Sequence, residues 1–486
     1  MKKRSLSISG LAALVVAAAL AGCGGTTYFA GRTLPPSGLT NRVMVAIQNT
    51  TTTTKGALEI MDAYYDTRSG YNGKPAGFSI SGYAGALPVT IQNMPEEQLA
   101  AVYGSGDGSF VSINYATEAN GSTLGTLNGA SSSVFVTRNQ SYVFAANLGS
   151  HVLTVLDRTN GSSYPFSLPG VYRVSVNPGG SVALAFVQNS NYVYYPRKLT
   201  TAQGIAFSGG SNTWPKAAVD CEPQNAPGWC LFQAQSPDSV DATGNYYGAP
   251  LVFDRPIKAV FSIDGGTAYV LSCGPECGGA NASITALPVG PMIFLIGQQS
   301  GTLPTSAALA KSTLAVPGGA SNALVDSSTM YVVGQKPQQV AGQTLFAGNL
   351  TVVNLLTSTA SSPVSISDGT PGAISRMLLA DDNTLWIGMS QCTNGVRAAT
   401  GHSYGCLTMF NTAKNAVTLI EPYLGDATGI AAVEGLHKIY TAEGGQVYIH
   451  STVDGSSIDN QYVTVTGTAY DVAYMDATSD SYNTVY

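Results

Sequence analysis

The stretch SYVFAANLGSHVLTVLDRTNGSS, residues 141–163, contains two short apolar runs joined by a Gly-containing turn, and it ends in a polar corner that includes Asn160 and Gly161. The runs YVFAA and VLTVL are rich in the β-branched and aromatic side chains that favour strands. Two such runs separated by a short turn are typical of a β-hairpin. The stretch therefore predicts one antiparallel hairpin followed by a sharp change of direction.

The same order of strand, turn, strand and polar corner recurs along the chain. It is found again in MYVVGQ with GNLTVVNLLTSTAS, in TLWIGMSQCTNG with GCLTMFNTAKNAV, and in KIYTAEGGQVYIHSTVDGSS. A further apolar strand precedes each hairpin, and these inner strands begin near Ile91, Val134, Val174, Lys258, Asn322, Arg376, Ile430 and Asp471. Three or four antiparallel strands repeated about every 40 residues are typical of a β-propeller blade. The repeat predicts an all-β chain folded as a β-propeller.

The two ends of the chain look like complementary parts of one blade. The segment AYDVAYMDATSDSYNTVY at residues 469–486 resembles inner strands without outer ones, whereas NRVMVAIQN and GALEIMDAYYDTR near the start resemble outer strands without an inner one. An open ring would leave unpaired sheet edges, so we expect the N-terminal and C-terminal strands to pair and close it. Seven internal units and one shared unit favour eight blades, with seven as the rival number.

The segment YVFAANLGSHVLTVLD, residues 142–157, resembles the YVTN-repeat propellers, a family of exported and surface proteins. The pattern covers about two thirds of the chain and is poor from Arg197 to Pro250. The resemblance implies the propeller fold, and it implies an exported protein without indicating an activity.

The N-terminus is organised like an export signal. Lys2, Lys3 and Arg4 precede an apolar stretch of about ten residues, which is too short to span a bilayer. The following Leu20-Ala21-Gly22-Cys23 resembles the lipobox of bacterial lipoproteins, and this implies removal of residues 1–22 and acylation of Cys23. Gly24 then favours the outer membrane, on either its periplasmic or its outer side. The alternative is an ordinary signal peptide with a cysteine near its cleavage site.

The charge of the chain limits the kinds of partner that it is expected to bind. Removal of the three basic residues of the signal lowers the number of Lys and Arg residues from 22 to 19 (22 − 3), against 28 Asp and Glu residues, so the net charge becomes about −9. The remaining sequence contains no cluster of Lys or Arg. Phosphate-backbone binding depends on such clusters, so nucleic acid is not expected as a partner. Residues 23–41 are rich in Gly, Thr and Pro and predict a flexible tether. Residues 42–486 then predict a single propeller domain with a long insertion at about 198–249.

Six cysteines remain after Cys23, and they form three close pairs in sequence. An oxidising compartment favours local disulfides, which would join the pairs Cys221 with Cys230, Cys273 with Cys277, and Cys392 with Cys406. The spacing in CGPEC also occurs in metal sites, but zinc would need two further ligands and no histidine is near in sequence. We therefore expect disulfides and no metal site, with metal binding and free thiols as the alternatives.

Binding residues are expected in the insertions, because loops on a rigid scaffold commonly carry function. The candidates are Trp214 and Trp229 in the long insertion, and His402 and Tyr404 in the loop between Cys392 and Cys406. The two shorter cysteine loops interrupt the hairpin between the second and third strands of their blades, so they should lie on one rim. A loop held by a disulfide loses little entropy on binding. The alternative is that the disulfides only protect exposed loops.

The sequence favours a binding or scaffold module for a protein or glycan partner, held at the membrane by its N-terminal lipid. No catalytic residues and no cofactor are predicted, since the chain lacks a nucleophile elbow, an H-E-x-x-H helix and a Gly-rich nucleotide loop. Two alternatives remain open. One is a propeller enzyme of the lactonase or quinoprotein type, and the other is a structural part of an envelope assembly complex.

Overall fold

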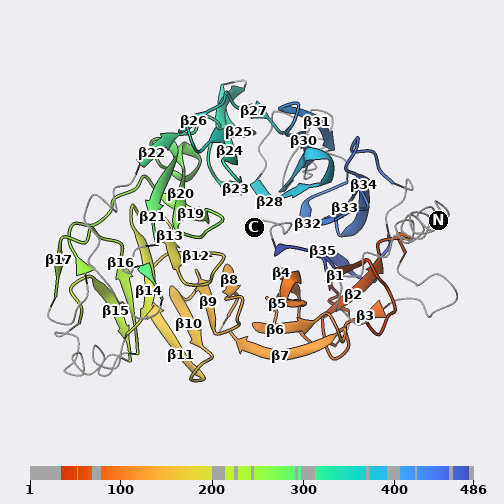
Figure 1. The fold of residues 1–486 in the computed structure, drawn as a ribbon, viewed down its shortest axis with the longest axis horizontal. Helices are drawn as coiled ribbons and strands as arrows, with labels where there is room; N and C mark the ends of the chain where they lie inside the picture. Colours follow the sequence, from red (N-terminus) through yellow and green to blue (C-terminus); the bar gives the residue numbers. More distant parts are fainter. Residues whose placement is uncertain are drawn as a thin grey trace, which may run out of the picture.

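A computed structural model shows eight antiparallel sheets arranged in a ring around a central axis (Figure 1). It describes residues 34–480 apart from 52, 68–77, 128, 200–213, 224–227, 242–245, 291–293, 297–311, 341, 368–372, 391–405, 422–423 and 459–462. Three short 3-10 turns lie wholly within the described residues: η1 (Pro95–Glu97), η3 (Gly274–Cys277) and η6 (Asp381–Asn383). The prediction of an all-β propeller with eight blades is confirmed, and the rival number of seven is excluded.

Each blade has an innermost strand beside the axis, and each blade is named here by that strand. All eight inner strands contain one of the predicted starting points. They are β4 (Pro88–Met94), β8 (Ser133–Val136), β12 (Val171–Val176), β19 (Pro256–Phe261), β23 (Asn322–Asp326), β28 (Ala373–Ala380), β32 (Ala427–Val433) and β35 (Thr468–Tyr474). The repeat in the sequence therefore corresponds to one blade per unit.

The second and third strands of each blade form the hairpins seen in the sequence. The opening stretch forms β9 and β10, in which Tyr142 lies opposite Asp157. The second strands are β5 (Leu99–Gly104), β9 (Tyr142–Asn147), β13 (Ala183–Val187), β20 (Thr267–Cys273), β24 (Thr329–Val340), β29 (Thr384–Ser390), β33 (Lys438–Glu443) and β1 (Arg42–Gln48). The third strands are β6 (Ser109–Asn114), β10 (Val152–Asp157), β14 (Val193–Lys198), β21 (Ala282–Pro288), β25 (Gln343–Asn354), β30 (Cys406–Asn411), β34 (Gln446–Ser451) and β2 (Gly56–Asp62).

Shorter strands form the outer rim of most blades. They are β7 (Ala119–Thr126), β11 (Ser162–Ser167), β22 (Ser312–Ala315), β26 (Thr359–Ala360), β27 (Val364–Ser365), β31 (Ala416–Glu421) and β3 (Phe78–Ser79). Both β26 and β27 pair with β25. In the β32 blade the described strands are β32, β33 and β34.

The long insertion partly extends a blade, which differs from the expectation of a loop. The chain leaves β14 and returns through β15 (Ala218–Glu222) and β16 (Trp229–Gln233), so the β12 blade has the order β12-β13-β14-β16-β15. β16 pairs directly with β14 and takes the place of a fourth strand. A separate ribbon of β17 (Ser239–Val240) and β18 (Tyr246–Tyr247) follows. Backbone hydrogen bonding along β14 explains why this segment is ordered as sheet.

The ring closes as expected, because the last strand of the described chain, β35, pairs antiparallel with the first, β1. The side chain of Arg42 binds Asp476 at 2.6 Å and Glu118 at 3.0 Å, which connects the two ends of the chain to the β4 blade. Ser37 donates to Glu118, and Leu39 packs in the core. The folded body therefore extends back to Ser37, which is earlier than the expected boundary at residue 42.

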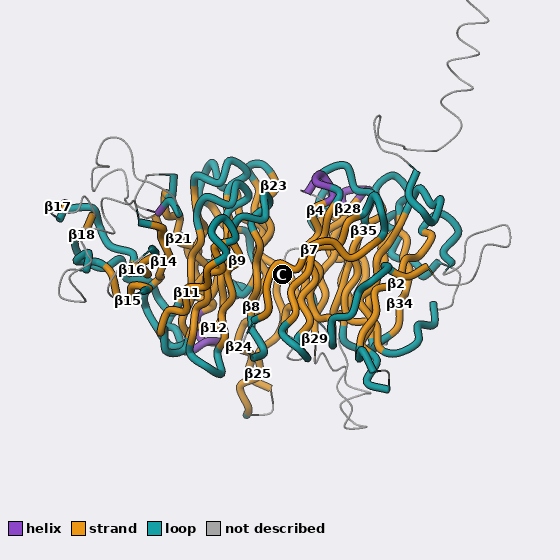
Figure 2. Tube along the Cα trace, turned by 90° about the horizontal axis from the view of Figure 1, so that it is seen from below, coloured by secondary structure: helices purple, strands orange, loops and turns teal. Residues whose placement is uncertain are grey.

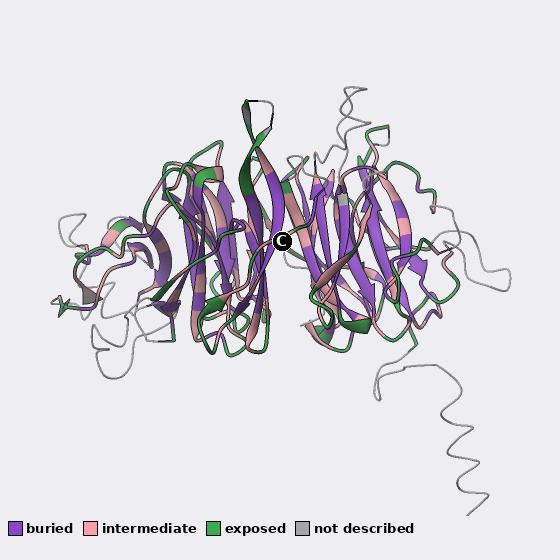
Figure 3. Cartoon of the chain, turned by 90° about the horizontal axis from the view of Figure 1, so that it is seen from above, coloured by how far each residue is buried: buried purple, intermediate pink, exposed green. Residues whose placement is uncertain are grey.

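Neighbouring blades bury their faces against one another (Figure 3). Between the β8 and β12 blades, for example, Phe144 and Val155 pack with Val174 and Ala185 in one apolar cluster. This two-sided burial explains why strands such as β10 carry apolar residues in runs instead of strict alternation. In the described part of the chain, no helix has the length and apolar character that a membrane crossing requires.

Candidate functional site

One side of the ring holds the connections between the second and third strands of every blade, and it is called the loop face here. Since strands alternate in direction, the inner strands also begin at this face. Two features occupy it in adjacent blades: the loop at residues 274–281 in the β19 blade and the long β24–β25 hairpin in the β23 blade. The hairpin extends beyond the rest of the ring in the side view (Figure 2). The predicted position of the CGPEC loop between second and third strands is confirmed.

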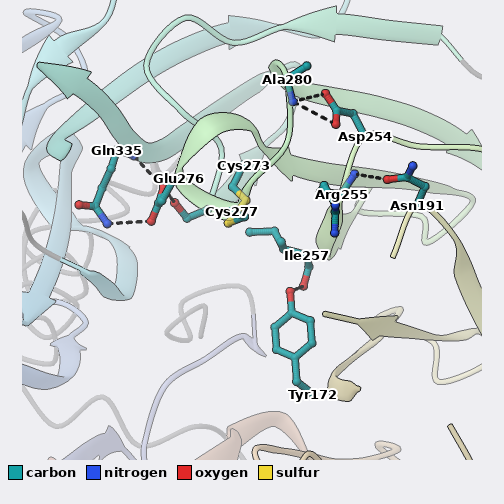
Figure 4. The surroundings of a disulfide bond; sticks show 11 residues. Tyr172, Asn191, Asp254, Arg255, Ile257, Cys273, Glu276, Cys277, Ala280 and Gln335 are labelled. Carbon is teal, nitrogen blue, oxygen red and sulfur yellow. Dashed lines mark hydrogen bonds between the residues drawn. A yellow bond between two sulfur atoms is a disulfide. The ribbon is translucent and has the colours of Figure 1, made fainter. Parts of the chain in front are cut away.

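The loop at residues 274–281 is fixed at three points. A disulfide joins Cys273 to Cys277 across η3. Asp254 accepts hydrogen bonds of 2.9 Å from the backbone N–H groups of Ala280 and Asn281 (Figure 4). The third point is Glu276, whose carboxylate points away from the disulfide toward the β24–β25 hairpin. The loop is therefore a rigid support next to the hairpin.

Glu276 joins this loop to the base of the hairpin. Its carboxylate accepts hydrogen bonds from the Gln335 side chain at 2.7 Å, the Gln335 backbone at 3.2 Å and the Ser321 hydroxyl at 2.9 Å. Burial raises the pKa of Glu276, and these hydrogen bonds act in the opposite direction. Gln335 is the last buried residue of β24 before the exposed run Lys336, Pro337, Gln338 and Gln339. Glu276 thus braces the hairpin where it leaves the blade.

The hairpin is longer than any other in the described part of the chain. β24 and β25 each have 12 residues, whereas every other described strand has at most eight. The pairing continues in register from Thr329 opposite Asn354 to Val340 opposite Gln343. At about 3.3 Å per residue, the five residues after Gln335 carry the hairpin roughly 16 Å past its base.

A second feature of the loop face is a layer of equivalent side chains around the central axis. In six blades a β-bulge occurs near the start of the inner strand, and the residue directly after it is Thr90, Arg173, Lys258, Arg376, Gly429 or Asp471. Alignment of the inner strands gives the members of this axial layer as Thr90, Ser133, Arg173, Lys258, Asn322, Arg376, Gly429 and Asp471. A bulge redirects the following side chain, and here it repeats around the ring.

Contacts within the axial layer cross from blade to blade. The Lys258 ammonium donates to Oδ1 of Asn322 at 2.7 Å, and a nitrogen of Arg376 lies 3.8 Å from Oδ2 of Asp471. The second contact passes over the β32 blade, whose equivalent residue is Gly429. A Cβ at Gly429 would lie 2.9 Å from Oδ1 of Asp471, so only glycine leaves room there.

Charge in the axial layer is unbalanced, since three cationic side chains face one carboxylate. Lys258 is 7% exposed. Burial lowers the pKa of Lys258 well below its usual range, and the charges of Arg173 and Arg376 lower it further. Burial also raises the pKa of Asp471 to about 6, against the opposing effect of Arg376. Asp471 accepts hydrogen bonds from the backbone N–H groups of Ile91 and Val472, which hold it in place.

The cysteines and binding residues predicted from the sequence lie in different parts of the structure. The disulfides Cys221–Cys230 and Cys273–Cys277 are both present. Trp214 is half-buried against the apolar cluster between the β12 and β19 blades. Trp229 is not in a loop: it lies within β16, is fully buried, and donates to Asp157 at 3.1 Å, so it offers no surface to a ligand. The predicted positions Cys23, Cys392, His402 and Tyr404 lie outside the described residues, and the side chain of Cys406 is likewise not described.

The axial layer was not predicted as a site. Lys258, Asn322, Arg376 and Asp471 were recognised only as strand starts, although their equivalent positions within the repeat were already visible. A comparison of the same repeat position in all units would have shown the charges together. In the described residues, no group of three or more His, Cys, Asp or Glu side chains is placed to hold a metal ion.

Comparison with known proteins supports the propeller fold but assigns no family or activity. No family model and no curated protein sequence matches the chain. Among solved structures, the chain is similar to the dihydro-heme d1 dehydrogenase NirN in complex with DHE, with a TM-score of 0.50, 9% identity, and coverage of 90% of this chain and 75% of that one. It is also similar to a putative 6-phosphogluconolactonase from Bacteroides fragilis, with a TM-score of 0.44, 10% identity, and coverage of 89% and 97%. At such identities the likeness is one of architecture.

Proposed function

We propose that this protein is a lipid-anchored propeller of the bacterial cell envelope that binds a protein partner through its loop face. The observation that carries the proposal is the β24–β25 hairpin, which extends beyond the face and is braced by the disulfide-held loop through Glu276. A rigid projecting element loses little conformational entropy when a partner binds it. A glycan is the alternative ligand for the same face.

The exposed part of the hairpin is suited to a protein surface. Lys336, Gln338 and Gln339 are exposed, and Gln339 donates to the Thr344 hydroxyl at 2.8 Å across the two strands. Each strand of an isolated two-stranded hairpin has an outer edge with backbone N–H and C=O groups available to another chain. Recognition would then combine backbone pairing with contacts to these polar side chains.

Membrane attachment rests on the sequence motif that ends in Cys23. Several acyl chains on that cysteine would hold the protein far more firmly than a single one. Cells expressing the wild-type protein should incorporate labelled palmitate into it, and the Cys23→Ser variant should not. Incorporation that persists in Cys23→Ser would contradict the anchor.

The partner site is tested by placing a photocrosslinking amino acid at Gln338 in intact cells, with Leu356 as the matched control. Leu356 belongs to the same blade, is 82% exposed, and lies in the turn between β25 and β26, on the opposite face. We expect a discrete crosslinked adduct from position 338 and none from position 356.

A trimmed variant tests the same point without a crosslinker. Gln335 pairs with Gly348, so residues 336–347 can be replaced by an Asn-Gly turn that leaves the base of the hairpin intact. The trimmed protein should unfold at the wild-type midpoint and lose the partner recovered from crosslinked cells. A partner retained at the wild-type level after trimming would overturn the proposal.

A further inference from the structure

The axial layer contains three cationic side chains, Arg173, Lys258 and Arg376, and one carboxylate, Asp471. Arg376 is paired with Asp471, whereas Arg173 has no ion pair with an acidic side chain in the described part of the chain, and the one hydrogen bond shown for the Lys258 ammonium goes to a neutral amide. Buried charges in proteins are normally paired or hydrogen-bonded to a counter-charge. Three cations with one carboxylate are therefore suited to receive a further negative group.

We propose that the axial layer binds a small oxyanion carrying two or more negative charges, between Arg173, Lys258 and Arg376. This proposal is independent of the protein partner assigned to the loop face. The ligand class is that of phosphate and of short di- or tricarboxylates, in which several oxygens are close together.

The hydrogen-bond donors of Arg173, Lys258 and Arg376 indicate this class of ligand. A guanidinium group presents a planar fork of N–H donors that matches the oxygens of carboxylate and phosphate, and an ammonium adds a compact point charge. Arg173 and Arg376 belong to blades on either side of the β19 and β23 blades, so their donors would approach a ligand from different directions. Chloride or acetate could neutralise only one of these cations at a time.

The layer is partly open to solvent. The Arg376 side chain is 13% exposed, and Arg173 is also only partly buried, in contrast to the 1% exposure of Asp471. The layer lies in the first half of the inner strands, near the loop face at which these strands begin. Part of the layer is therefore accessible to a small ion.

Burial of the cations strengthens the expected affinity. Burial and the charges of Arg173 and Arg376 lower the pKa of Lys258, and a bound oxyanion would oppose this shift because its counter-charge favours the ammonium form. Hydrogen bonds to charged groups are stronger than those between neutral groups. Loss of one such donor should therefore weaken binding roughly tenfold or more.

The test is isothermal titration calorimetry of the full-length protein in detergent at pH 7, with sodium phosphate and with citrate as separate ligands. Acetate and sodium chloride at equal ionic strength are the ligand controls. We expect one saturable site for phosphate, citrate or both, and the preferred ligand identifies the phosphoryl or the carboxylate class. Arg173→Gln and Lys258→Met should each weaken it at least tenfold.

Two further variants guard against misfolding as an explanation. Lys414→Gln removes one exposed positive charge from a turn on the outer part of the β28 blade and should leave the affinity within twofold of wild type. Asp471→Asn removes the one carboxylate of the layer and should tighten binding severalfold, a gain that a damaged fold would not produce. The proposal is overturned if neither oxyanion gives a saturable site, if Arg173→Gln and Lys258→Met bind as tightly as wild type, or if both anions behave as adventitious ions that Lys414→Gln weakens equally.

Discussion

Two groups of buried charged residues in this propeller contain arginine, but they differ in the ratio of cationic to acidic side chains. At the ring closure, Arg42 is 4% exposed and is held between Glu118 and Asp476, with a further hydrogen bond to the carbonyl of Tyr115 at 2.6 Å. In the axial layer, Arg376 lies 3.8 Å from Asp471, whereas Arg173 and Lys258 have no ion pair with an acidic side chain in the described residues. The closure network is neutralised within the chain, which identifies it as structural. Within the described residues the axial layer keeps an excess of positive charge, and this excess is the basis for the proposed oxyanion site.

The closure network should show the largest effect on stability. Replacing Arg42 by Met keeps the aliphatic stem but leaves Glu118 and Asp476 without their cation, so we expect a loss of about 3–5 kcal/mol in the free energy of unfolding. Urea unfolding followed by circular dichroism measures it.

Arg138 provides the matched control for Arg42. It also binds acidic partners near the C-terminus, including Asp480 at 2.7 Å, but its side chain is 37% exposed. Exposed ion pairs contribute at most about 1 kcal/mol, so Arg138→Met should stay within that limit. Equal losses for the two variants would show that burial of the Arg42 network has no special role.

The axial carboxylate should produce the next largest effect, visible as a dependence on pH. Burial raises the pKa of Asp471 to about 6, above about 3.9 in an unfolded chain, so the folded state binds more protons between these values. The stability contribution is therefore fully present below about pH 4 and is lost as the pH rises through 6, by about 3 kcal/mol in total.

Asp471→Asn isolates this contribution. The variant cannot titrate at position 471, and Asn322 shows that an amide fits the equivalent position of another blade, where its Oδ1 accepts from the next backbone N–H at 2.9 Å. From pH 4 to pH 7, the free energy of unfolding of Asp471→Asn should rise by about 3 kcal/mol relative to that of the wild type. A difference that is constant across this range would contradict the raised pKa.

Replacement of Lys258 should give the smallest of these changes in stability. It should stabilise the protein, whereas replacement of a lysine with an acidic partner destabilises it. Lys258→Met removes a buried ammonium that Arg173 and Arg376 repel, so stability at pH 7 should rise by about 1–2 kcal/mol in urea unfolding. The same change at Lys438, which binds Asp66 at 2.6 Å, should lower stability. Destabilisation by both variants would mean that the axial layer is as well balanced as the closure network.

Much of the fold could be predicted from the sequence because a propeller blade is a local unit. Each hairpin, such as β9 and β10, is written in one continuous stretch, and each inner strand starts where the repeat begins. Ring closure was predictable as well, because the segments that form β1 and β35 are incomplete blades when considered alone.

The long insertion and its tryptophan were harder to predict. The segment that forms β15 and β16 lacks the repeat pattern, and its order comes from pairing with β14. Trp229 therefore became a buried strand residue that donates to Asp157, although its sequence context is typical of a loop. Strand formation at a sheet edge depends on the neighbour that supplies hydrogen bonds, which a local pattern does not contain.

The repeat, the closure of the ring and the disulfides Cys221–Cys230 and Cys273–Cys277 could be predicted from the sequence, because each depends on residues that are near in the chain or on whether a unit is complete. The positions of Arg173, Lys258 and Arg376 around one axis become visible only in the folded ring, as do the hydrogen bonds from Gln335 to Glu276 of the preceding blade. These residues are far apart in sequence, and only the closing of eight blades into a ring brings them together.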